Sequence, residues 1–112
     1  MQMPALLQAE IEKMLEGMPA QAVRAAAQSL SRRYRQGEKN PDGANLLQSE
    51  TEIAAYAAFR MPATYAALVT ALRMAEESGC GEMRTLTDVG AGSGSAYWAV
   101  REVFGEPERA VL

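Results

Sequence analysis

Residues 85–98 read Thr-Leu-Thr-Asp-Val-Gly-Ala-Gly-Ser-Gly-Ser-Ala-Tyr-Trp and decide the fold of this chain. The β-branched and apolar residues at the start of the stretch predict a short buried parallel strand over residues 85–89. Gly90, Gly92 and Gly94 follow at once, and residues 95–104 favour a helix. A strand, a glycine turn and a helix in this order open a nucleotide-binding β-α-β unit. The stretch therefore predicts an α/β protein with a ligand site at the turn.

The spacing of the glycines narrows the choice of ligand. A dinucleotide fingerprint, G-x-G-x-x-G, requires a glycine at position 95, where Ser95 stands. A Walker loop requires a lysine after its last glycine, and no lysine lies nearby. The alternative is a tight strand-to-helix turn without a ligand. We favour the ligand site because the glycines lie between a predicted strand and a predicted helix.

The pattern Asp-x-Gly-x-Gly-x-Gly over residues 88–94 resembles motif I of the Rossmann-like methyltransferases that use S-adenosylmethionine (SAM). This resemblance implies that the turn borders the methionine and ribose parts of the cofactor, and that the acid reaches the methionine ammonium group. The cofactor-binding residues that it implies in the turn are Asp88, Gly90, Ala91, Gly92 and Gly94. A nicotinamide-binding domain is the weaker alternative, because of the serine at position 95.

Composition excludes several other classes of protein. A chain of 112 residues is long enough for one small domain, and its composition and net charge of −3 predict a globular protein without a general affinity for nucleic acid or membranes. Cys80 is the only cysteine and there is no histidine, which excludes an internal disulfide and a Cys/His metal cluster within this chain. No apolar run is long enough to span a bilayer. Acidic residues near the N-terminus argue against a leader peptide, so we expect a cytoplasmic protein.

Helical periodicity and helix-breaking residues predict four helices before the strand. Their approximate bounds are residues 4–18, 19–36, 49–61 and 62–78. The third helix begins with a capping box, Ser49-x-x-Glu52, and residues 37–45 between the second and third helices predict a loop. We therefore expect residues 1–80 to form a helical N-terminal region against the edge of the sheet, and residues 81–112 to begin the SAM-binding domain.

A second strand is predicted to begin only at about Arg109. A complete methyltransferase domain needs a full parallel sheet covered on both faces. We therefore expect this chain to be the N-terminal part of a longer protein. The expected fold class is α/β and mostly helical by content: a helical N-terminal region, followed by the first β-α-β unit of a Rossmann-like SAM methyltransferase fold, truncated.

A basic patch lies at the end of the second predicted helix. Arg32, Arg33 and Arg35 surround Tyr34, and a basic patch with an aromatic ring suits RNA phosphates and a stacked base. The favoured alternative is structural, because cations in a last helical turn complement the helix dipole and Tyr34 lies on the core face.

A second block runs from Tyr56 through Arg60-Met-Pro-Ala-Thr-Tyr65. Upstream helices often lie across the opening of a glycine-turn site, which makes Arg60 and Tyr65 candidate cofactor-binding residues. Tyr65 fits the core equally well, with its hydroxyl reaching the surface. The two interpretations stay open.

This block, together with the glycine turn and Tyr97-Trp98, resembles a methyltransferase-like family of small-ribosomal-subunit assembly factors. The family includes mitochondrial proteins and bacterial ribosomal RNA (rRNA) methyltransferases, and Leu30–Arg35 resembles the end of its N-terminal helical segment. The resemblance implies SAM as cofactor and the small ribosomal subunit and its rRNA as partners. The alternative function is a non-catalytic ribosome-assembly or RNA-binding factor that keeps the methyltransferase fold.

Other parts of the family pattern are expected beyond Leu112. They are the acid that holds the ribose, the motif that faces the methyl acceptor and a cysteine cluster for a metal centre. Glu106 and Glu108 precede the second strand, at its wrong end, and do not replace the ribose-binding acid. No residue here is predicted to be catalytic or to bind a metal. We expect the chain alone to bind SAM weakly or not at all and to self-associate through its exposed strand.

Overall fold

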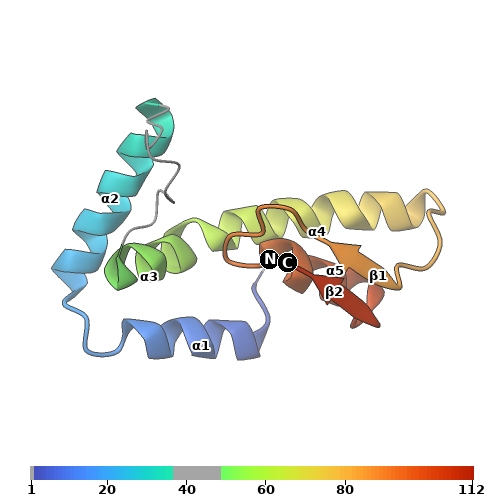
Figure 1. The fold of residues 1–112 in the computed structure, drawn as a ribbon, viewed down its shortest axis with the longest axis horizontal. Coiled ribbons are helices and arrows are strands. Elements are labelled where there is room, and N and C mark those ends of the chain that lie inside the picture. Colours follow the sequence, from blue (N-terminus) through green and yellow to red (C-terminus); the bar gives the residue numbers. More distant parts are fainter. Residues whose placement is uncertain (1, 37–48) are drawn as a thin grey trace. The chain divides into compact units, whose positions relative to one another are not determined.

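The structure is a computed structural model that describes residues 2–36 and 49–112 (Figure 1). Its elements in chain order are α1 (Ala5–Leu15), α2 (Ala20–Gln36), α3 (Glu50–Phe59), α4 (Met61–Glu77), β1 (Thr85–Thr87), α5 (Ser95–Phe104) and β2 (Arg109–Val111). The expected mostly helical content is confirmed. The predicted loop at residues 37–45 lies outside the described residues, as does the side chain of Tyr34.

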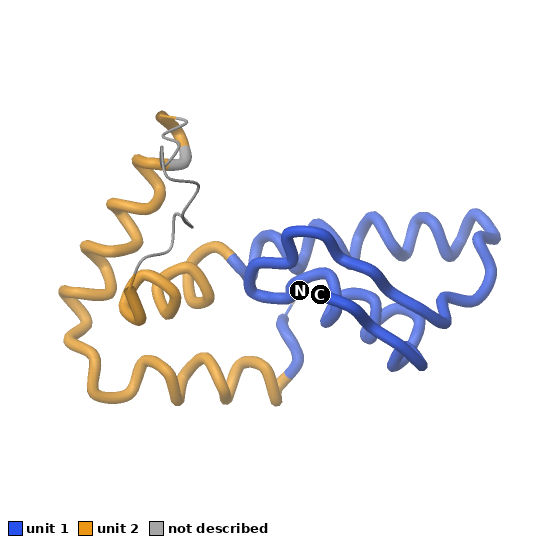
Figure 2. Tube along the Cα trace, in the orientation of Figure 1, with its two compact units in different colours: residues 1–4, 61–112 blue, residues 5–60 orange. Residues whose placement is uncertain are grey.

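The chain divides into two compact units (Figure 2). One unit is Ala5–Arg60, and the other joins Met1–Pro4 to Met61–Leu112. This division differs from the expected boundary at residue 80. The reason is that α4 packs against α5, so that α4 belongs with the β-α-β segment rather than with the preceding helices.

The unit of residues 5–60 contains α1, α2 and α3. Its core cluster consists of Val23, Leu30 and Ala55, joined by partly buried residues that include Met18 and Tyr56. α1 ends at Leu15, before the predicted end at residue 18, because the chain turns at Gly17, where φ is 78°. A positive φ is strained for most other residues, so glycine ends the helix there.

The capping box at the start of α3 is confirmed. Ser49 has an extended backbone, and its hydroxyl oxygen accepts a hydrogen bond from the Glu52 backbone N–H at 3.1 Å. This bond satisfies one of the N–H groups that have no partner within the first turn of a helix. The local sequence therefore fixes where α3 begins.

In the second unit, α4 and α5 lie side by side and run parallel. Tyr65 and Val69 of α4 pack with Ala99 of α5 in a buried cluster. Further along both helices, the Arg73 guanidinium lies 3.7 Å from the Glu102 carboxylate. The residue numbers of the contacting pairs increase together along α4 and α5, so the two helices run in the same direction. Successive helices of an α/β unit have this arrangement.

β1 and β2 form a parallel pair joined through α5, in the register Thr85↔Arg109, Leu86↔Ala110 and Thr87↔Val111. The predicted second strand at Arg109 is confirmed. The prediction that the first strand is buried was wrong, because Thr85 and Thr87 are exposed and only Leu86 is partly buried. Two strands of three residues leave most of their surface uncovered. The described residues form one β-α-β unit, and a full Rossmann-like sheet stays an inference.

Candidate functional site

The glycine turn lies between β1 and α5, and its backbone requires glycine. The φ angles are 71° at Gly90, 57° at Gly92 and 82° at Gly94, all in the left-handed region. Apart from the adjacent residues of the chain, a Cβ placed on any of the three would meet no heavy atom within 4 Å. Gly90 and Gly92 are exposed and Gly94 is buried, so the first part of the turn faces open space that a ligand group can approach.

Asp88 and Ala91 complete the predicted site in the turn. The Asp88 backbone N–H donates to the Val111 carbonyl at 2.8 Å, which extends the β1–β2 pairing by one bond, and its side chain is half-buried. The Ala91 carbonyl accepts from the Gly94 N–H at 3.0 Å and closes the turn. Gly94 is the N-cap residue of α5 and supplies no side chain to its N–H groups. The turn thus places one carboxylate beside a row of small residues at the amino end of a helix.

Arg60 and Tyr65 fall in different compact units. Arg60 is the C-cap residue of α3, where its N–H donates to the Tyr56 carbonyl at 2.9 Å. Tyr65 is 1% exposed and lies in the core between α4 and α5. Burial raises the pKa of Tyr65 above its ordinary value of 10.0, and the negative charge of Glu102 raises it further. The positive charge of Arg73 lowers this pKa, but by less than the other two raise it. Tyr65 therefore occupies a core position, which was one of the two interpretations of its place in the sequence. A cofactor-binding role of Arg60 and Tyr65 stays a prediction.

The predicted RNA-binding arginines have different environments. Arg32 and Arg35 are exposed, and the Arg35 Nε–H donates to the Ser31 carbonyl at 3.4 Å. Arg33 instead forms an ion pair with Glu52 of α3, and the two side chains are 19% and 18% exposed. Arg33 thus has a structural role, whereas the charges of Arg32 and Arg35 face solvent.

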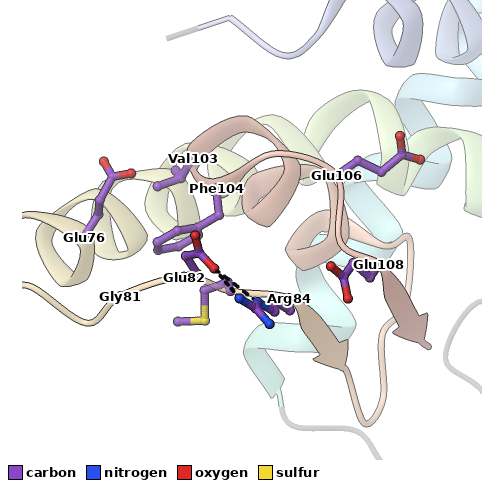
Figure 3. A pocket seen from close by; sticks show the side chains of 9 residues that line it. Glu76, Gly81, Glu82, Arg84, Val103, Phe104, Glu106 and Glu108 are labelled. Atoms are coloured by element: carbon purple, nitrogen blue, oxygen red, sulfur yellow. Dashed lines mark hydrogen bonds and ion pairs between the residues drawn. The ribbon is translucent and has the colours of Figure 1, made fainter.

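A hollow of about 530 Å³ lies at the opposite end of the strands from the glycine turn (Figure 3). Residues just before β1 and just before β2 line it, together with the ends of α4 and α5. Its charged lining consists of Glu76, Glu82, Arg84, Glu106 and Glu108, and Glu82 accepts two hydrogen bonds from Arg84. No three metal-ligating side chains come together anywhere in the described residues. The hollow is therefore an open acidic surface rather than a part of the glycine-turn site.

Sequence reasoning noted Tyr97-Trp98 only as a part of a family pattern and missed their partner, Arg101. The Arg101 guanidinium carbon lies 5.4 Å from the centre of the Trp98 ring, and the Tyr97 and Trp98 rings meet edge to face at 5.7 Å. The spacing of Trp98 and Arg101 in the sequence could have indicated this contact, because residues three apart on a helix are neighbours. This group lies on the α5 helix that begins at the glycine turn.

Helices followed by one parallel β-α-β unit with a glycine turn define an α/β protein that is mostly helical by content. A family model described as mitochondrial small ribosomal subunit Rsm22 matches residues 50–112, which is more than half of the chain. The chain belongs to this family, and membership links it to the function of the small ribosomal subunit.

The comparisons with curated proteins and with solved structures found no match. Among the helices of the described residues, none has the length and apolar character needed to cross a membrane.

Proposed function

We propose that this protein binds SAM at the glycine turn and acts on or with the small ribosomal subunit as a methyltransferase-like protein. The observation that carries the proposal is the run of three left-handed glycines between a parallel strand and its helix, of which Gly90 and Gly92 are exposed. Family membership supports the ribosomal part of the proposal.

The residues of the turn fit the cofactor that the pattern implies. Open space over the exposed Gly90 and Gly92 leaves the backbone accessible to a bulky group. The Asp88 carboxylate supplies a negative charge that suits an ammonium group. The positive end of the α5 dipole favours negative charge at the turn, such as a carboxylate group. Asp88, Gly90, Ala91, Gly92 and Gly94 would hold the cofactor.

When bound, SAM supplies an activated methyl group, so that a protein contributes mainly positioning and electrostatics. The described residues include the turn that positions the cofactor and no residue that we assign to proton transfer. The carboxyl end of β2 carries Val111 and Leu112, which cannot accept hydrogen bonds from ribose hydroxyls through their side chains. We therefore expect residues 1–112 to bind SAM weakly and to transfer no methyl group.

Nuclear magnetic resonance detects weak binding and tests the proposal. We expect millimolar SAM to shift the backbone amide signals of Gly90, Gly92 and Gly94 in the isotope-labelled chain. Gly92→Val should abolish these shifts, because it places a branched side chain on the open face of the turn. Gly79→Ala is the matched control, since Gly79 also has a positive φ, of 85°, and open space around it.

Two results of this titration would contradict the proposal. Unshifted glycine signals at saturating SAM, in a chain whose circular dichroism shows intact helices, would mean that the turn is structural. Equal or larger shifts with a nicotinamide dinucleotide would favour the dinucleotide alternative.

The second candidate function is a non-catalytic assembly or RNA-binding factor. Two observations favour it. The family model that matches the chain is described by a ribosomal subunit and not by an enzyme activity, and Arg32 and Arg35 of α2 are exposed. Co-sedimentation with small ribosomal subunits without methyl transfer to their rRNA would support this function. Incorporation of a labelled methyl group into the rRNA by the native protein would support the enzyme.

Self-association is a further part of the proposal. The residues at the carboxyl ends of the strands are apolar and exposed, with Val89 at 93%, Val111 at 50% and Leu112 at 61%. A strand edge with apolar surface pairs with other strands. We expect light scattering to show dimers or larger species of residues 1–112, and Val111→Lys to reduce them. A monomer at high concentration would contradict this expectation.

A further inference from the structure

The group formed by Tyr97, Trp98 and Arg101 on α5, here named the α5 platform, has no role in the SAM proposal. Trp98 is half-buried and packs against the cluster of Tyr65, Val69 and Ala99. This packing holds one side of the indole ring. The Arg101 guanidinium lies over the ring, and Tyr97 meets it edge to face with the ring planes at 80°. The platform is therefore a set of three planar groups fixed on a core.

The platform carries a positive charge that faces solvent. Arg101 is exposed, and the ion pairs in the described part of the chain use other arginines, namely Arg33, Arg73 and Arg84. The neighbouring carboxylate of Glu102 is taken by Arg73. A planar cation on an aromatic face, without a carboxylate of its own, is a surface for a planar and negatively charged partner.

We propose that the α5 platform binds a base of single-stranded RNA, which stacks on the outer face of the Arg101 guanidinium where this group covers the Trp98 ring. Unpaired RNA bases stack on aromatic rings and on arginine planes, and the adjoining phosphates favour a positive charge. This inference rests on the proposed function, because the RNA of the small ribosomal subunit is the nucleic acid that family membership suggests.

The position of the platform suits a protein that acts on RNA at the glycine turn. The Trp98 backbone N–H donates to the Gly94 carbonyl at 3.3 Å, so the ring lies one helical turn after the N-cap of α5. Four residues of a helix rise about 6 Å. A base on the platform is thus held close to the turn on the same rigid helix.

A stabilising contact within the helix is the alternative explanation for the pair. Exposed cation–π contacts contribute about 0.5–1 kcal/mol, and residues three apart meet on any helix. Such a contact predicts no response of Trp98 to RNA. The two explanations therefore differ in a measurable signal.

Trp98 is the only tryptophan of the chain, so tryptophan emission, excited at a wavelength that the four tyrosines do not absorb, reports on the platform alone. The probe is a single-stranded adenine homopolymer of about 12 nucleotides, within the usual size of such sites. We expect saturable quenching of Trp98, and no quenching by a duplex of the same length, because paired bases are not free to stack. Affinities of the variants are measured by anisotropy of the labelled RNA.

Three variants separate stacking from charge. Arg101→Ala should weaken binding about tenfold, in line with the loss of one stacked base. Arg101→Lys should weaken it nearly as much, because lysine keeps the charge but has no plane. Arg84→Ala is the matched control, since Arg84 is an exposed arginine at the other end of the strands and its loss should change the affinity less than twofold.

Several outcomes would overturn the proposal. They are binding without quenching, full rescue by Arg101→Lys, and equal losses for Arg101→Ala and Arg84→Ala. Absence of RNA binding by a chain with intact helices would also overturn it. Co-sedimentation of the native protein with small subunits is measured in parallel, because binding to the particle without a Trp98 response rejects the platform and leaves the proposed function in place.

Discussion

Arg33 of α2 donates a hydrogen bond to the Glu52 carboxylate of α3, and this ion pair joins two helices across the unit of residues 5–60. Both side chains are less than one-fifth exposed. A charge-assisted bond that is shielded from water is stronger than an ion pair on an open surface. Since Glu52 also lies in the first turn of α3, its carboxylate favours the helix at the same position.

We expect this pair to contribute to the stability of the chain. A double-mutant cycle with Arg33→Ala and Glu52→Gln should give a coupling energy of about 1–2 kcal/mol in urea unfolding. Arg32→Ala is the control, and its effect should stay within about 0.5 kcal/mol, as for an exposed substitution. A coupling energy near zero would show that the pair does not hold the two helices together.

The pKa of Tyr65 predicts a loss of stability in alkali. Burial raises this pKa above 10.0 in the folded chain, whereas an unfolded tyrosine ionises near its ordinary value. The stabilisation is therefore complete below pH 10.0 and is lost as the pH rises from there to the folded pKa, at about 1.4 kcal/mol for each pH unit. Tyr65→Phe should remove this part of the pH dependence. Identical alkaline slopes for the two proteins in urea unfolding would contradict the argument.

Serine should be unfavourable at Gly94, although serine is normally a good N-cap residue. The φ of 82° at Gly94 lies in the left-handed region, where a side chain costs about 1–2 kcal/mol. Ser49, the N-cap residue of α3, has a φ of −139°, which serine adopts without strain, so that its hydroxyl oxygen can cap the helix. We expect Gly94→Ser and Ser49→Ala each to lower the free energy of unfolding by about 1 kcal/mol. A stabilising Gly94→Ser would show that the turn adopts another conformation in solution.

The exposed arginines of α2 predict a salt-dependent affinity for RNA. Because Arg33 is engaged with Glu52, we assign phosphate contacts to Arg32 and Arg35 alone. The slope of log affinity against log salt is negative, and replacing both arginines by alanine should reduce its magnitude by about 1.4 on single-stranded RNA. Filter binding at several salt concentrations measures the slope. A double variant of Lys13 and Arg84 removes the same charge elsewhere, and an equal change of slope there would reject a specific contact.

Short-range signals in the sequence predicted the bounds of several elements. The Ser49 capping box, the start of β2 at Arg109 and a helix over residues 95–104 were confirmed. The break predicted at Met61-Pro62 lies one residue earlier, at Arg60, and Met61 and Pro62 begin α4. Each of these features depends on residues within a few positions along the chain. The positive φ angles of the glycine turn have the same origin, because only glycine adopts them without strain.

The candidate site could be located from sequence, but its surroundings could not. The turn itself lies where the pattern of Asp88 and the glycines predicted it, between β1 and α5. The exposure of β1 could not be predicted, since Thr85 and Leu86 have the same β-branched and apolar character as residues of a buried strand. Burial depends on which elements cover a strand, and the strand's own residues do not specify them.

The sequence by itself determined where helices begin and end and where the backbone turns, because caps, prolines and glycines act on their immediate neighbours. Only the tertiary structure decided which residues meet. It grouped α4 with α5 and placed Tyr65 in their core. It also paired Arg33 with Glu52, 19 positions along the chain. These contacts depend on how amphipathic helices pack, and the same sequence pattern is compatible with several packed arrangements.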